Sequence, residues 1–164
     1  RFSLPRPLMG RAGCDFSFAG LKTACVREVE RLGSLTDQDR ADLCAGFQAA
    51  VLDVLEDRTL QAMRQFDPIW GAKGRLVAAG GVAANRAIRA KLEALAVARG
   101  YDFIAPPLKW CTDNAAMIAL AGAERLRLGF SDDLSVAARP RWPLDEAAAR
   151  LRPSHTPGRK GAKA

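Results

Sequence analysis

Histidine is nearly absent from this sequence: His155 is the single histidine in 164 residues. His155 lies near the end of the chain, in a segment that we expect to be disordered. Serine-histidine pairs, cysteine-histidine pairs and multi-histidine metal sites therefore cannot be built from this chain alone. Any catalysis must depend on groups supplied from elsewhere, or catalysis is absent.

Long apolar runs are missing too. No stretch approaches the roughly 20 apolar residues that span a bilayer, and no basic-then-apolar leader opens the chain. We therefore expect no membrane association and a cytoplasmic location. The apolar content of 49% is nevertheless enough to form the core of one soluble globular domain.

Cysteines are few and widely separated. None of the four forms a Cys-x-x-Cys pair, so neither a zinc ribbon nor a redox dithiol is indicated. We expect four reduced and mostly buried thiols, at Cys14, Cys25, Cys44 and Cys111.

The net charge of +7 is concentrated at the end of the chain. Residues 147–164 contain five basic residues and no acidic one, which leaves residues 1–146 only mildly basic. A segment rich in proline, glycine and basic residues cannot bury apolar surface, so we predict a folded domain over 1–146 and a disordered tail over 147–164. The tail is either simply solvated or contacts a nucleic-acid backbone.

The first residue is Arg1 rather than methionine. Pro5 and Pro7 follow, and each proline disfavours the helical conformation in the residue before it, so residues 1–8 are predicted to be an extended connector. We expect the chain to begin within a longer protein.

Apolar periodicity predicts two helices in the first half of the chain. Residues 21–32 carry apolar side chains at helical spacing, and Gly33 is a plausible end. A second helix is predicted to start after Thr36, whose hydroxyl can accept from the amide of Asp39, and to end before Pro68.

The second half predicts a strand-helix-strand unit. Residues 76–79 form a short apolar run that meets Gly80 and Gly81, a helix follows from about residue 84 to Gly100, and residues 101–104 resemble a second strand. The length of this crossover suits parallel strands. A last helix is predicted from about residue 113 to 128. The strand-helix-strand unit and the predicted helices together indicate an α/β fold that is rich in helix.

Two turns could carry chemistry. At residues 80–85, two glycines after a strand let a ligand approach the backbone, and Asn85 could bind that ligand, although such turns also serve close packing alone. At residues 110–114, Asp113 could cap a helix or could ligate a metal ion. Both turns follow strands, so they could share one cleft.

Four blocks resemble a known family in order and spacing. They are DFSFAGLKTA at residues 15–24, FQ at 47–48, AGGVAANR at 79–86 and CTDNAAMI at 111–118. Over residues 1 to about 130 the sequence resembles the threonylcarbamoyladenosine tRNA transferases. The resemblance implies an actin/Hsp70-like (ASKHA) nucleotide-binding architecture, of which residues 1–146 would be the carboxy-terminal part.

The resemblance also implies a reaction and its partners. The exocyclic amine of tRNA adenosine-37 would attack threonylcarbamoyl-adenylate and release AMP, and accessory proteins of the same pathway would take part. Asp113 matches the family's carboxylate ligand for one divalent metal ion, iron or zinc. Asn85 matches the family's adenylate-binding asparagine, with Gly80 and Gly81 beside the nucleotide.

Other parts of the family pattern have no counterpart here. The two metal-binding histidines, the glycine-rich phosphate loop and several donor-binding residues belong to the family's amino-terminal half. We therefore expect this chain to be inactive alone. Three alternatives remain: a related carbamoyltransferase of the hydrogenase-maturation type, a sugar-kinase or chaperone-ATPase half, and a non-catalytic scaffold with the same fold.

Overall fold

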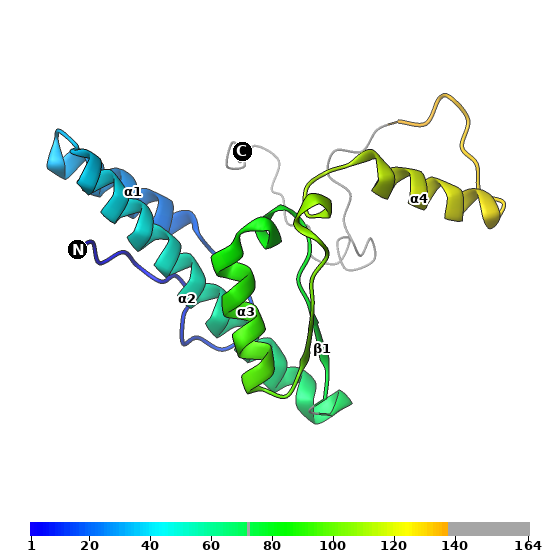
Figure 1. The fold of residues 1–164 in the computed structure, drawn as a ribbon, viewed down its shortest axis with the longest axis horizontal. Helices are drawn as coiled ribbons and strands as arrows, with labels where there is room; N and C mark the ends of the chain where they lie inside the picture. The colour runs from blue at the N-terminus through cyan, green and yellow to red at the C-terminus, as the bar shows by residue number, and fades with distance from the viewer. Residues whose placement is uncertain (72, 138–164) are drawn as a thin grey trace. The chain divides into compact units, whose positions relative to one another are not determined.

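The computed structural model describes residues 1–71 and 73–137 (Figure 1). Residues 1–118 form one compact unit and the described residues 119–137 belong to a second, and each is treated by itself. The predicted tail at 147–164, its His155 and the expected boundary at residue 146 lie outside the described residues.

Helices dominate the described chain, with one small sheet. In chain order the elements are α1 (Ala19–Leu32), α2 (Asp37–Trp70), β1 (Arg75–Val77), a 3-10 turn (Gly81–Ala84), α3 (Arg86–Ala98), β2 (Asp102–Ile104), a 3-10 turn (Leu108–Trp110) and α4 (Ala115–Arg127). Strands β1 and β2 are adjacent and parallel, with Leu76 opposite Phe103. The predicted helix-rich α/β fold with a small parallel sheet is confirmed.

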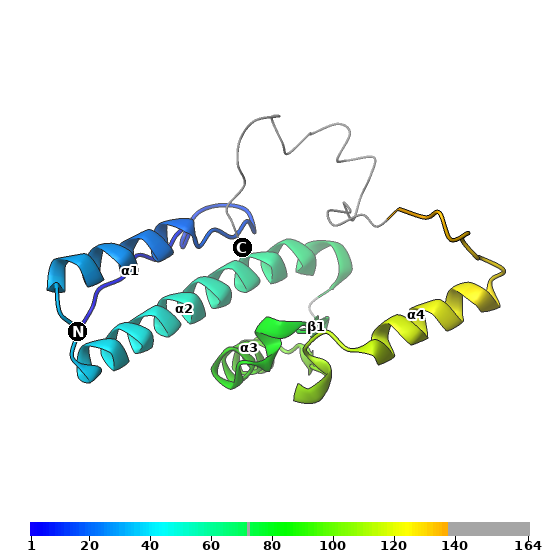
Figure 2. The ribbon, with the colours of Figure 1, turned by 90° about the horizontal axis from the view of Figure 1, so that it is seen from above.

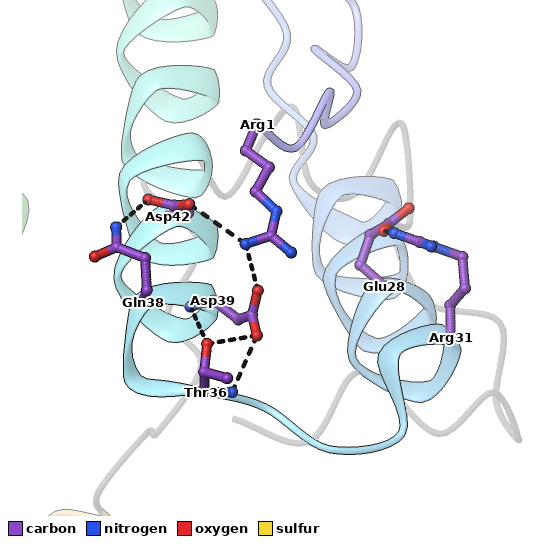
Figure 3. A network of polar contacts seen from close by, with 7 residues as sticks. All are labelled: Arg1, Glu28, Arg31, Thr36, Gln38, Asp39 and Asp42. Carbon is purple, nitrogen blue, oxygen red and sulfur yellow. Dashed lines mark hydrogen bonds and ion pairs between the residues drawn. The ribbon is translucent and has the colours of Figure 1, made fainter.

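Helix α2 begins at a complete capping box. The Thr36 hydroxyl accepts from the Asp39 amide at 3.1 Å, and the Asp39 carboxylate accepts from the Thr36 hydroxyl and amide at 2.6 and 3.0 Å (Figure 3). Arg1 adds an ion pair to Asp39 at 2.5 Å. The predicted start of this helix is therefore confirmed, and the amino-terminal segment is tied to it.

The capping box should make the fold sensitive to acid. Hydrogen bonds from Thr36 first, and then the Arg1 charge, hold the pKa of Asp39 below its ordinary value. A carboxyl group with a lowered folded-state pKa stabilises the fold above its unfolded pKa of about 4, and this contribution is lost as the pH falls through the folded-state pKa. We expect Tm to fall less steeply with acid in Asp39→Asn than in the unchanged chain. Parallel Tm profiles would contradict this role.

The predicted end of α2 is wrong. We expected the helix to stop before Pro68, but it continues through Pro68 to Trp70 and ends at Gly71, which has a φ of +90°. A proline removes one amide donor from a helix and crowds the preceding turn. Because Pro68 lies in the final turn, little helix follows it, and the Gly71 amide still donates to the Asp67 carbonyl at 2.9 Å.

The segment before α1 packs along α2, as does α1 itself (Figure 2). Leu4, Leu21 and Ala50 form the buried core at this contact. Arg58, which is fully buried on α2, pairs with Asp57 and donates to the Gly13 carbonyl at 3.0 Å. These contacts hold the loop that leads into residues 15–24, the first block of the family resemblance.

Helix α3 lies between α2 and the sheet. Met63 of α2, Leu95 and Ala96 of α3, and Tyr101 before β2 form a second buried cluster. The Tyr101 hydroxyl donates to Asp67 at 2.5 Å. This packing fixes the strand-helix-strand unit against α2 and so places the turns that follow β1 and β2.

Apolar surface is exposed at the sheet and along α4. Val77 at the end of β1 is 62% exposed and Ile104 at the end of β2 is 45% exposed. Helix α4 has no buried residue within the described part of the chain. None of the described helices is both long enough and apolar enough to cross a membrane.

Candidate functional site

The two turns identified from the sequence follow the carboxyl ends of two parallel, adjacent strands. Strand β1 ends at Val77 and β2 at Ile104, directly opposite each other, and the Ala78 amide donates to the Ile104 carbonyl at 2.9 Å. The segments that follow the two strands therefore leave the sheet at the same end, the carboxyl end of the strands. In α/β sheets ligands bind at this end.

The first turn contains two glycines with different requirements. Gly80 has a φ of +81° and a ψ of −179°, a conformation that is costly for any residue with a Cβ atom. Gly81 does not have a positive φ, and a Cβ atom at either glycine would meet nothing within 4 Å. Close packing inside the described part of the chain therefore does not explain the pair. The backbone explains Gly80, and Gly81 leaves space open beside the turn.

Asn85 has a structural task that the sequence did not reveal. Its side-chain oxygen caps α3 by accepting from the amides of Ala87 and Ile88 at 2.9 and 3.2 Å. Its side-chain nitrogen Nδ2 donates to Oε1 of Gln48 on α2 at 3.3 Å. The cap decides which end of the amide is oxygen. One N–H of Nδ2 is then left for a ligand, whereas the side-chain oxygen is already used by the cap.

A groove of about 870 Å³ opens beside Asn85. Its walls are mainly aromatic and aliphatic side chains from the segment before α1, from α1 and α2, from the 3-10 turn after β1, and from the start of α3. Among them are Phe16, Phe18, Phe47, Val82 and Ile88, and the amides of Gln48 and Asn85 are its polar groups. Apolar walls with a few placed polar groups are typical of small-molecule sites of this size.

In the second turn, Asp113 does not cap a helix. Asn114, not Asp113, is the residue before α4, and its side-chain oxygen accepts from the Met117 amide at 3.2 Å. Asp113 is exposed, and its carboxylate has no hydrogen bond or ion pair within residues 1–71 and 73–137. The capping interpretation therefore belongs to Asn114, and the Asp113 carboxylate is available to a ligand.

Arg89 joins the two turns, and sequence reasoning missed it. From α3 its Nε and Nη2 atoms donate to the Ala83 carbonyl at 3.2 and 3.1 Å. Nη2 also donates to the Pro106 carbonyl at 2.8 Å and to Cys111 Sγ at 3.2 Å. Backbone carbonyls leave no mark in a sequence, so only the position of Arg89, one turn after Asn85, could have suggested this role.

The thiols are free, but most are not buried. All four cysteines are unpaired in the described chain, yet only Cys111 is buried, whereas Cys44 is exposed and Cys14 and Cys25 are intermediate. The expectation of mostly buried thiols was wrong because Cys25 and Cys44 line the open groove. Partial burial raises the pKa of the Cys25 thiol, and the neighbouring Cys44 raises it further.

No group of three or more metal-ligating side chains occurs among the residues that the structure describes. Asp113 can therefore supply one carboxylate oxygen to a metal ion but cannot complete a site. A carboxylate oxygen of this kind is compatible with a ligand of a divalent metal ion.

Comparison with known proteins gives one consistent similarity. The family model for tRNA N6-adenosine threonylcarbamoyltransferase matches residues 1–120. Among curated proteins of that name, the one from Caulobacter vibrioides is 58% identical over 165 residues, covering 100% of this chain and 44% of that protein. The one from Cereibacter sphaeroides strain KD131 is 55% identical, with coverages of 100% and 45%. The one from Methylorubrum populi is 61% identical, with coverages of 90% and 43%. The chain thus spans less than half the length of these relatives.

Proposed function

This chain belongs to the tRNA N6-adenosine threonylcarbamoyltransferase family, and from that premise we propose that it is the carboxy-terminal part of an enzyme that modifies tRNA adenosine-37. The complete enzyme would transfer the threonylcarbamoyl group from threonylcarbamoyl-adenylate to the exocyclic amine and release AMP. The fold would be part of an actin/Hsp70-like lobe. Besides tRNA and the adenylate donor, the partners would be accessory proteins of the same pathway.

The position of Asn85 is the observation that carries this proposal. It lies where the glycine turn, the start of α3 and the apolar groove meet. An adenylate has a flat apolar base and a phosphate. The groove suits the base, and the open space beside Gly81 suits the phosphate, which can approach the backbone there. The free N–H of Asn85 would donate to the bound nucleotide.

Asp113 would hold a divalent metal ion, iron or zinc, together with ligands from the amino-terminal part of the enzyme. When bound, such an ion would act as a Lewis acid toward the oxygens of the donor. The role of this chain is to present a hard, unpaired carboxylate on a turn next to the glycine turn. No covalent intermediate with a side chain is required.

The test is Asn85→Ser in the full-length enzyme, read by equilibrium binding of AMP. Asparagine and serine cap helices about equally well, so α3 should keep its cap while the Nδ2 donor is lost. Loss of one neutral hydrogen bond should weaken AMP binding by roughly 10-fold with little change in Tm. Asn85→Ala is a poorer test because it also removes the cap. AMP affinity equal to wild type would remove Asn85 from the nucleotide site.

A further inference from the structure

The two turns of the candidate site are linked by one guanidinium group. Arg89 lies on α3, and its four hydrogen bonds reach the Ala83 carbonyl in the glycine turn and Pro106 and Cys111 in the turn that precedes Asp113. Among the residues that the structure describes, Arg89 is the side chain that bonds to both turns. Asn85 and Asp113 each lie two residues beyond an acceptor of Arg89.

An arginine is suited to this task. Its planar guanidinium holds five N–H donors in a fixed fork, whereas lysine has a single flexible ammonium group. Two of the acceptors are backbone carbonyls, so the fork fixes main-chain positions and not only side chains. The third acceptor, Cys111 Sγ, is buried, with 2% of the residue exposed. The contact is therefore partly shielded from water and should be rigid.

We propose that Arg89 is a positioning residue, which fixes the distance between the turn that carries Asn85 and the turn that carries Asp113. The inference rests on the proposed function, because it concerns how nucleotide and metal ion are held relative to each other. Arg89 touches neither ligand. It sets the geometry in which a donor bound at one turn meets an ion bound at the other.

Other polar side-chain contacts of α3 are ion pairs outside the two turns. Lys91 pairs with Glu56 at 2.7 Å, and Arg99 at the end of the helix pairs with Asp67 at 3.0 Å. These pairs join α3 to α2 and leave the two turns untouched. Arg99 therefore offers a matched control, since it is an arginine at the end of the same helix with a structural contact only.

The experiment compares Arg89→Lys with Arg99→Lys in the full-length enzyme. Four quantities would be measured: kcat with tRNA and threonylcarbamoyl-adenylate, the Kd for AMP, the iron and zinc content, and Tm. Small misplacements of reacting groups reduce rates by about 100-fold, so kcat of Arg89→Lys should fall by about that factor. Its AMP affinity and metal content should stay within about threefold of wild type, because each turn still holds its own ligand. Arg99→Lys should keep the wild-type kcat.

Several results would overturn the inference. A kcat close to wild type in a folded Arg89→Lys enzyme would show that the spacing does not depend on this fork. A loss of AMP binding or metal matching the loss of kcat would make Arg89 part of one ligand site. If Arg89→Lys does not fold, Arg89→Gln is the second variant: its shorter amide cannot bond to both carbonyls, so an unchanged kcat there would reject the inference. Failure of the proposed function is seen separately, as absence of transfer by the wild-type enzyme.

Discussion

Replacing Asp113 with asparagine in the full-length enzyme is expected to remove the bound metal ion and nearly abolish threonylcarbamoyl transfer, while Tm stays close to wild type. The structure assigns the cap of α4 to Asn114, so the change at Asp113 costs the helix no capping bond. The Asp113→Asn substitution replaces an exposed carboxylate by a neutral amide of almost equal size. Mutation of an outer-shell partner of a metal ligand already costs roughly 10–100-fold, so loss of the ligand charge should cost more.

The neighbouring residue provides the control for this prediction. Asn114→Ala should lower the stability of the start of α4 by about 1 kcal/mol, because the cap to Met117 is lost, but it should leave the metal content unchanged. Elemental analysis and tRNA transfer assays on both variants separate the two roles. Metal content and turnover near wild type in Asp113→Asn would end the ligand hypothesis for this residue.

Elements specified by local signals could be predicted from the sequence. Gly33 ends α1, and Thr36 with Asp39 begins α2, because the partners of each signal lie within a few residues along the chain. The parallel pairing of β1 and β2 could also be predicted, because the length of the connection between them suits parallel strands. Pro68 misled the prediction because a proline in the last turn shortens a helix much less than one in the middle.

The candidate site could be predicted only in part. Asn85 and Asp113 were identified as site residues, but the sequence did not reveal that Asn85 caps α3. It also could not show that Asn114 rather than Asp113 caps α4, because asparagine and aspartate cap about equally well. Only the observed first residue of each helix shows that Asn85 and Asn114 are the caps. Arg89 was missed because two of its acceptors are main-chain carbonyls, those of Ala83 and Pro106, which lie 6 and 17 residues away in the sequence. A main-chain carbonyl is present in every residue and therefore gives no signal in a sequence.

The groove depends on tertiary packing and could not be predicted. Gln48 and Asn85 are 37 residues apart in the sequence and meet only because α3 packs against α2. Gln48 was part of the family resemblance, yet no local pattern gave its task. In the structure Gln48 accepts from Nδ2 of Asn85, so a residue predicted to bind nucleotide is also in contact with another helix.

The 164-residue chain alone is expected to show no detectable transfer to tRNA. Its described residues provide one candidate metal ligand, Asp113, and contain no group of three or more ligating side chains. The relatives it matches are more than twice as long, and this chain covers 44% of the Caulobacter vibrioides protein. A single exposed carboxylate binds a divalent ion only weakly, because metal affinity depends on the number of ligands. The purified chain should therefore also contain no bound iron or zinc.

Restoring the rest of the enzyme should restore activity, and this separates an incomplete site from an unrelated function. The chain would be produced alone and together with the amino-terminal part of the same enzyme, and its folding would be checked by circular dichroism. Transfer would be assayed with threonylcarbamoyl-adenylate, tRNA and the accessory proteins. The complemented sample should modify adenosine-37, and the chain alone should not. Transfer by the chain alone would show that its own residues complete the site, and a folded but inactive complemented sample would contradict the proposed activity itself.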